Sequence, residues 1–289
     1  MSRIRLLLPA ALLLRAGPVM AQEEVGWGFR AENRSAMFLF IIFTLTIMVA
    51  IWLARRGRDL YIRRIAGLNA VEEAIGRSTE LGKKVLFVPG IGSIGEVQTL
   101  ASMAVLKHVA KHTAEYGTPL EVPNKDPLTY AAARETVKEA YLEAGRPDLF
   151  NEEMVPYITY DQFAYTAAVT GRMVREKPAA NFLIGSFYAE SLLLAEAGQS
   201  TGAIQIAGTA EVAQLPFFVT TCDYTLIGEE LYAASAYLSR EPVMLGCIKG
   251  QDFVKFLLLV WVLIGILWMS FAPEAWNPDV FSTLLISGG

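Results

Sequence analysis

Histidine and cysteine are scarce in this chain, which has two of each among its 289 residues. Two cysteines cannot supply a disulfide framework, and we expect Cys222 and Cys247 to be buried apolar thiols. The sequence has no C-x-x-C pair, P-loop, nucleophile elbow or kinase motif. Neither histidine is expected near the serines that follow the predicted strands, which argues against a serine hydrolase triad. We therefore predict no catalytic residues and favour a non-enzymatic role.

Net positive charge is missing from the middle of the chain. Ile65–Asp252 contains 14 lysines and arginines against 23 aspartates and glutamates, a net charge of −9. A nucleic-acid-binding surface normally carries an excess of basic residues, because it must neutralise phosphates. We therefore expect no nucleic acid partner.

Two segments lack charge of either sign. Residues 37–54 and 256–271 contain no Asp, Glu, Lys or Arg and are almost entirely apolar. With their flanks, both are long enough to cross a hydrocarbon core, which needs roughly 20 residues. The sequence thus predicts two transmembrane helices, with the lipid bilayer as a partner.

The start of the chain is typical of a secretory signal peptide over residues 1–21. It has Arg3 and Arg5, then a short apolar run, then small side chains at Val19 and Ala21. The run is too short to cross a bilayer, although an uncleaved signal anchor is the alternative. A signal peptide exports the residues that follow it.

Basic residues on the cytoplasmic side of a span set its orientation. The tail at 272–289 has no Lys or Arg, whereas five arginines crowd the end of the first span: Arg55, Arg56, Arg58, Arg63 and Arg64. We therefore predict a bacterial inner-membrane protein with its soluble domain in the cytoplasm and both mature termini outside, as the signal peptide also requires.

Short apolar runs alternate with longer helical patterns between the two spans, which is typical of a doubly wound, mostly parallel α/β sheet. The predicted strands are 85–88, 120–122, 155–159, 182–184, 203–206 and 243–245. The predicted helices are 59–80, 95–116, 128–143, 161–175, 188–197 and 211–238, with Gly117, Gly145 and Gly198 as stop signals. Pro216 interrupts the last of these, so two helices joined by a bend are the alternative there. The predicted organisation is a signal peptide at 1–21, an extracytoplasmic segment at 22–36, spans at 37–54 and 253–271, a juxtamembrane helix at 55–82, the cytoplasmic domain at 83–252 and an extracytoplasmic tail at 272–289.

A carboxylate follows each of four turns made of small residues: Glu96, Asp161, Glu190 and Glu211. In a parallel sheet these turns share the carboxyl edge, where open α/β sheets bind ligands. Capping gives a simpler explanation, since acidic side chains satisfy free N–H groups at helix starts.

A glycine motif follows the first predicted strand and opens the next helix. Gly90, Gly92 and Gly95 fit G-x-G-x-x-G, and here the sequence resembles the Rossmann dinucleotide-binding family over about 30 residues. The resemblance implies a Rossmann-like fold and an NAD or other nucleotide site formed by these glycines, Ser93 and the ribose-binding acid Glu121. Glu96 departs from the pattern, because its charge would repel a pyrophosphate. A glycine turn used for close strand-helix packing, with no cofactor, is the alternative.

His108 and His112 lie four residues apart on one predicted helix, so their imidazoles share a face that suits a transition metal. Two histidines alone do not complete a ligand set, and lysines flank both of them. We therefore predict a solvated cationic face and no metal site.

The arrangement as a whole is similar to an uncharacterised family of bacterial membrane-anchored proteins whose domain has no known function. The similarity lies in Ile62–Asn69, in the glycine turn Val88–Glu96 and in the residues around Glu211. It implies no mechanism. Scarce catalytic residues and anchors at both domain ends favour a scaffold or assembly component that forms homo-oligomers or packs with other membrane proteins. The alternative is a membrane-tethered nucleotide-binding sensor or redox domain.

Overall fold

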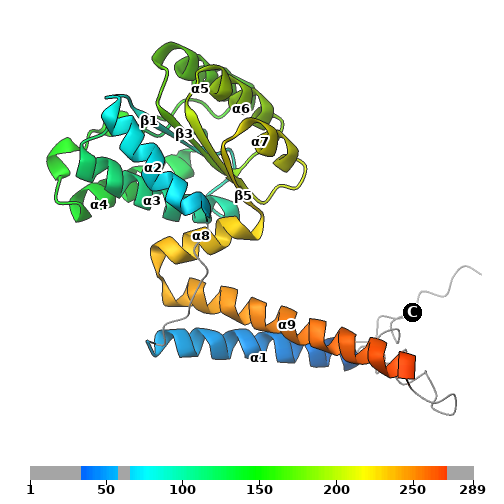
Figure 1. Cartoon of the computed structure of the whole chain (residues 1–289). Helices are drawn as coiled ribbons and strands as arrows, with labels where there is room; N and C mark the ends of the chain where they lie inside the picture. The colour runs from blue at the N-terminus through cyan, green and yellow to red at the C-terminus, as the bar shows by residue number, and fades with distance from the viewer. Residues whose placement is uncertain (1–33, 58–65, 272–289) are drawn as a thin grey trace, which may run out of the picture. The chain divides into compact units, whose positions relative to one another are not determined.

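The computed structural model describes residues 34–57 and 66–271, which Figure 1 traces in colour. The predicted signal peptide, most of the extracytoplasmic segment 22–36 and the tail 272–289 lie outside these residues. The chain divides into two compact units. The larger is Phe43–Leu263. The smaller contains the described residues up to Ile42 and those from Ile264 onward.

Five parallel strands form one sheet in the order β2-β1-β3-β4-β5. They are β1 (Val85–Gly90), β2 (Leu120–Glu121), β3 (Ala180–Ser186), β4 (Ile204–Thr209) and β5 (Tyr224–Ile227). The predicted α/β class and parallel sheet are thus confirmed. The winding direction reverses between β1 and β3, so the switch point of the sheet lies at their carboxyl ends.

Nine α-helices occur in the described part of the chain. They are α1 (Arg34–Arg55), α2 (Ala66–Glu80), α3 (Val97–Tyr116), α4 (Pro127–Glu143), α5 (Gln162–Glu176), α6 (Glu190–Ser200), α7 (Leu215–Thr221), α8 (Glu229–Ser239) and α9 (Pro242–Phe271). Two 3₁₀ turns, Pro147–Leu149 and Glu152–Met154, follow α4. Helix α4 shows why a helix begins where it does: the Asp126 carboxylate accepts the N–H of Thr129, and Pro127 occupies the first turn.

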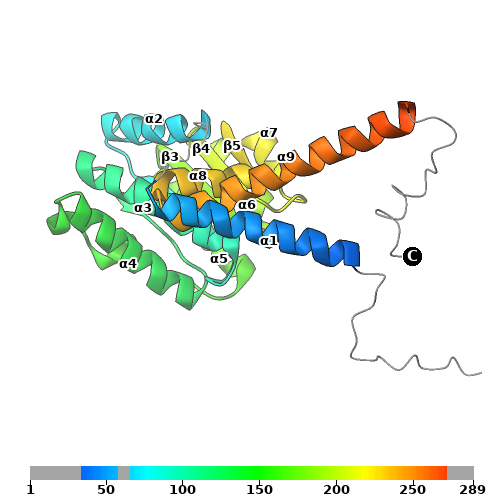
Figure 2. The same cartoon turned by 90° about the horizontal axis from the view of Figure 1, so that it is seen from below.

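Helices cover both faces of the sheet, because its central strands are apolar on both sides. Val85 and Phe87 of β1 join the core under α2, α3, α4 and α8, whereas Leu86 and Val88 join the core under α5, α6 and α7. Figures 1 and 2 show α3 and α4 side by side on the first of these faces. The sheet is therefore the middle layer of three.

Three predicted elements are wrong. Residues 155–159 form no strand, and only Tyr157 makes an isolated bridge, with Asn124. The region 211–238 is not one helix but two, α7 and α8, as the alternative expected, and it also contains the unpredicted strand β5, whose residues before Gly228 pair with β4. Residues 243–245 belong to α9, whose helical period continues unbroken into the apolar segment.

Gly198 is not the predicted helix stop, because it lies inside α6. A Cβ there would lie 2.0 Å from Oε1 of Gln205 and 2.8 Å from Nδ2 of Asn181, so glycine lets α6 approach the sheet. Gly117 does end α3, in the left-handed conformation with φ 69°. Cys222 and Cys247 are free and only half-buried, so the prediction of fully buried thiols is wrong.

One helix among the described residues, Pro242–Leu267, is long and apolar enough to cross a membrane, while the apolar stretch Leu39–Arg55 of α1 is shorter. Both expose large apolar side chains, including Phe40 and Leu45 in α1 and Phe256 and Leu259 in α9. Two glycines let the helices meet. A Cβ on Gly246 would lie 2.5 Å from Cα of Ile51, and one on Gly250 would lie 2.9 Å from Cα of Ile47.

Candidate functional site at the carboxyl edge of the sheet

The glycine turn leaves β1 at the switch point, beside the end of β3. Gly90 has φ +80°, and a Cβ there would lie 2.4 Å from the carbonyl oxygen of Ser186. The same carbonyl accepts the N–H of Ile91 over 2.8 Å. Gly90 is therefore required by the backbone contact between β1 and β3, whether or not a ligand binds.

Gly92 faces the side chain of Glu96 at the start of α3. A Cβ on Gly92 would lie 2.5 Å from Oε2 of Glu96 and 2.8 Å from Oγ1 of Thr99. The N–H of Ser93 donates to Oε1 of Glu96 over 3.1 Å. The Glu96 carboxylate thus accepts an N–H group of the turn that a phosphate would otherwise use.

Gly95, the third glycine of the motif, makes no close approach. The nearest atom to a Cβ there is Oγ of Ser93, at 3.9 Å. In a dinucleotide fold the third glycine serves close helix-strand packing. The position is open here, so the third glycine does not perform that packing role.

The acidic residue after β4, Glu211, accepts a hydrogen bond from α3. Gln98 donates from Nε2 to Oε1 of Glu211 over 2.8 Å, and its Oε1 accepts the N–H of Ala210, also over 2.8 Å. The Thr209 hydroxyl donates to the same Gln98 oxygen over 3.2 Å. One glutamine of α3 therefore fastens the turn after β4.

The carboxylate after β3 is fully buried and also has partners. Glu190 is 0% exposed and accepts the N–H of Tyr188 over 2.9 Å and Nε2 of Gln162 over 2.5 Å. Asp161, the fourth predicted carboxylate, caps α5 by accepting the N–H of Ala164 over 2.7 Å. All four carboxylates thus bind groups of the chain itself, but only Asp161 caps a helix, since α3, α6 and α7 have no side-chain cap. The capping interpretation therefore holds for one of the four.

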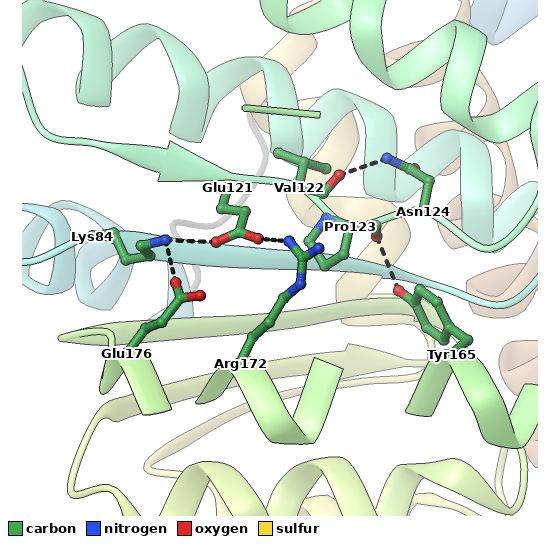
Figure 3. A network of polar contacts seen from close by, with 8 residues as sticks. All are labelled: Lys84, Glu121, Val122, Pro123, Asn124, Tyr165, Arg172 and Glu176. Carbon is green, nitrogen blue, oxygen red and sulfur yellow. Dashed lines mark hydrogen bonds and ion pairs between the residues drawn. The ribbon is translucent and has the colours of Figure 1, made fainter. Parts of the chain in front are cut away.

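Glu121 takes part in a separate ion-pair network, drawn in Figure 3. Its side chain is 9% exposed, and Oε2 accepts Nζ of Lys84 over 2.7 Å, while Oε1 pairs with Arg172 of α5. Lys84 also pairs with Glu176 at the end of α5. The network ties β2 and the residue before β1 to one face of α5.

These pairs set the charge of the network. Burial alone raises the pKa of Glu121, but hydrogen bonds from Lys84 and Arg172 outweigh it and hold the pKa below its ordinary value of 4.5. Burial likewise lowers the pKa of Lys84, and its bonds to Glu121 and Glu176 outweigh that effect and raise the pKa above 10.5. Glu121 and Lys84 are therefore both charged at neutral pH.

The structure does not bring Glu121 to the glycine turn. Glu121 is in register with Leu86, four residues before Gly90, which is about 13 Å along a strand. The chain continues past Glu121 through Pro123, whose carbonyl accepts the buried hydroxyl of Tyr165 over 2.9 Å. Of the predicted site residues, Gly90, Gly92, Ser93 and Gly95 lie together, and Glu121 lies apart in the ion-pair network.

The family model described as Domain of unknown function (DUF6754) matches residues 25–280. The chain belongs to this family. No match was found among curated proteins or among solved structures. The DUF6754 match spans both apolar helices and the α/β domain between them, so the family is defined by the whole arrangement and not by the glycine motif alone.

Sequence reasoning missed one cluster in this DUF6754 chain. It treats His108 and His112 as a pair without a third ligand, but α2 places the carboxylate of Glu72 beside them. Burial, with smaller effects of His112 and Lys111, lowers the pKa of His108 to about 4, so its imidazole is neutral at neutral pH. Glu72 precedes His108 by 36 residues, so only the packing of α2 on α3 reveals the contact.

Proposed function

We propose that this chain is a non-enzymatic scaffold that assembles as a homo-oligomer in the bacterial inner membrane. In this proposal α1 and α9 both span the bilayer, and the α/β domain lies in the cytoplasm next to it. The arginines that follow α1 favour this orientation. The exposed apolar side chains of both helices are consistent with lipid contact.

One observation carries the proposal: at the edge where an α/β sheet normally binds its ligand, the carboxylates bind groups of the chain itself and large apolar side chains are exposed. Glu96, Glu190 and Glu211 all bind groups of the chain itself. The segments at this edge expose large apolar side chains, namely Val97, Leu100, Tyr160, Phe163, Tyr188 and Val212. Such residues suit a protein-protein interface better than a polar small-molecule site.

The oligomer is tested with the full chain in mild detergent, by light scattering corrected for bound detergent. We expect a mass several times the 31.7 kDa of one chain. Val212→Glu should shift the mass toward the monomer, because it places a charge on a side chain that is 78% exposed at this edge. Val174→Glu is the matched control. Val174 is also exposed, but it lies near the end of α5, away from the carboxyl edge of the sheet where α5 begins. A monodisperse wild-type monomer would refute the proposal.

The second candidate is a Rossmann-like nucleotide site at the glycine turn. Two buried hydroxyls beside the turn, Thr99 Oγ1 and Ser186 Oγ, have no hydrogen-bond partner, which favours a ligand there. The charge of Glu96 opposes an anionic one. Calorimetric titration with NADH, NADPH, ATP and FAD should give heat with Glu96→Gln at lower concentration than with wild type. No heat with either protein would eliminate this candidate.

A further inference from the structure

Three side chains that commonly ligate transition metals meet between α2 and α3. One ligand atom each of Glu72, His108 and His112 lies within 4.8 Å of the other two. The two imidazoles are edge to face, with ring centroids 4.4 Å apart, as expected for positions four residues apart on a helix. The carboxylate comes from a different element, so the cluster depends on the tertiary fold.

The packing of α2 against α3 and the sheet fixes the backbone that carries Glu72. Val71 and Ile75 are 0% exposed and belong to the core that α2 shares with α3. The hydroxyl of Thr79, in the last turn of α2, is hydrogen-bonded over 2.5 Å to that of Thr118, just past the end of α3. Glu72 follows Val71 and is itself exposed, so its side chain is free to adjust while its backbone is fixed.

We propose that Glu72, His108 and His112 bind one divalent transition-metal ion of the zinc type, with a fourth position open to water. Two imidazoles and one carboxylate form a ligand set of zinc sites that keep an open position. Tetrahedral donors around zinc lie about 3.3 Å apart, given bonds of about 2.0 to 2.1 Å. Closure therefore requires a movement of at most about 1.5 Å, within reach of side-chain rotation of Glu72.

The surroundings of His112 support the assignment. Its Nδ1 is buried and lies 3.0 Å from Oε2 of Glu115, within reach of a hydrogen bond when Nδ1 carries the proton. A carboxylate beside one imidazole nitrogen is the usual outer partner of a metal-bound histidine, and it leaves Nε2 for the ion. The ring is also stacked at 6.4 Å on Tyr116, which limits its rotation.

The charges near the cluster are compatible with a cation. Lys107 is paired with Glu139 at 3.0 Å and with Glu143 at 2.8 Å, so its charge is balanced on the side of α4. Lys111 adds one positive charge, against the negative charges of Glu72 and Glu115. Metal binding here would join α2 to α3 and stabilise the folded domain by an amount that rises with the logarithm of the free metal concentration above Kd.

The test uses the full chain, purified with a histidine-free tag, stripped with a chelator and titrated with Zn²⁺ by calorimetry and with Co²⁺ by visible absorption. We expect one ion per chain and tetrahedral cobalt bands. Glu115→Gln changes only an outer partner and should lower the zinc affinity by roughly 10- to 100-fold. His112→Ala and Glu72→Gln remove a ligand and should lower the affinity further. Zinc should also raise the thermal unfolding temperature of wild type.

Glu73→Gln is the matched control, because Glu73 is exposed on the same helix, outside the cluster, and should bind zinc like wild type. Glu72 is exposed, so its variant tests the site even where a histidine variant fails to fold. Absence of zinc binding by wild type, or equal affinity in Glu72→Gln and Glu73→Gln, would overturn the proposal.

Discussion

Among single residues, Glu121 makes a clear contribution to stability, because its buried carboxylate pairs with two cations. Glu121→Gln removes both ion pairs and leaves Arg172 without its anion. We expect a loss of about 2 kcal/mol in the free energy of unfolding, the range for hydrogen bonds to charged groups. Chemical denaturation in detergent measures it. Glu176→Gln should cost less, because the Glu176 side chain is 36% exposed, and an equal or larger cost would contradict this ranking.

The same network predicts how stability depends on pH. The pKa of Glu121 is lower in the folded chain than the 4.5 of an unfolded one, so its contribution is present above pH 4.5 and is lost as pH falls through the folded pKa. Lys84 has a raised pKa, so its contribution is present below pH 10.5 and is lost at higher pH. The stability difference between wild type and Glu121→Gln should therefore shrink in acid. A constant difference down to pH 2 would refute the assignment.

The glycine turn gives a second prediction at the residue scale. Gly90→Ala should destabilise the domain by about 2 kcal/mol or more, because alanine is strained at φ +80° and its Cβ would meet the Ser186 carbonyl. Gly95→Ala should change stability by less than about 1 kcal/mol, since the site is open. Thermal unfolding followed by circular dichroism compares the two. Equal effects would mean that the close approach at Gly90 is not what requires glycine.

At the scale of elements, the contact between α1 and α9 depends on Gly246 and Gly250. Glycines four residues apart present one smooth stripe, which lets helix backbones approach. Gly246→Leu should destabilise the helix pair by about 1 to 3 kcal/mol, because the new side chain would overlap Ile51. Val262→Leu is the control, since Val262 is 57% exposed on the same helix. Unfolding in increasing concentrations of denaturing detergent is the measurement, and equal stability would refute the contact.

The elements that sequence reasoning predicts well are those whose apolar period is unambiguous. β1 and β3 are buried on both faces, and α4 carries its own start signal at Asp126 and Pro127. β5 escapes prediction because its four residues lie between α7 and α8, where a few β-branched residues do not interrupt the helical pattern strongly. A strand this short is stabilised by pairing with β4 and not by its own sequence.

The candidate sites also differ in how far apart their residues lie in the sequence, and this decides which of them can be predicted. The glycine turn is local in sequence, so Gly90, Gly92, Ser93 and Gly95 are found together as predicted. Glu121 lies near the end of the second predicted strand, where a ribose-binding acid is expected, but its partners Lys84 and Arg172 lie 37 and 51 residues away. Glu72 is similarly remote from His108. Contacts between separate elements decide the role of such side chains, and one sequence does not specify them.

For the whole molecule, the proposed topology predicts the behaviour of reporter fusions. Alkaline phosphatase folds only where its disulfides form, outside the cytoplasm. A fusion after Ile286 should therefore be active in a bacterial host, and one after Glu143 should be inactive. Replacing the five arginines after α1 by Asn should weaken this bias. The reverse activities would overturn the orientation.

The connection between α8 and α9 has a mechanical consequence. Only Arg240 and Glu241 separate the two helices, and Lys255, well inside α9, donates to Oε1 of Glu229 at the start of α8 over 2.6 Å. α8 in turn packs on α3. A linker of two residues allows almost no independent motion, so a rotation or tilt of α9 must move α8 with it. The α/β domain is therefore rigidly coupled to α9. A displacement of α9 would be transmitted through α8 to the sheet, because no flexible linker separates them.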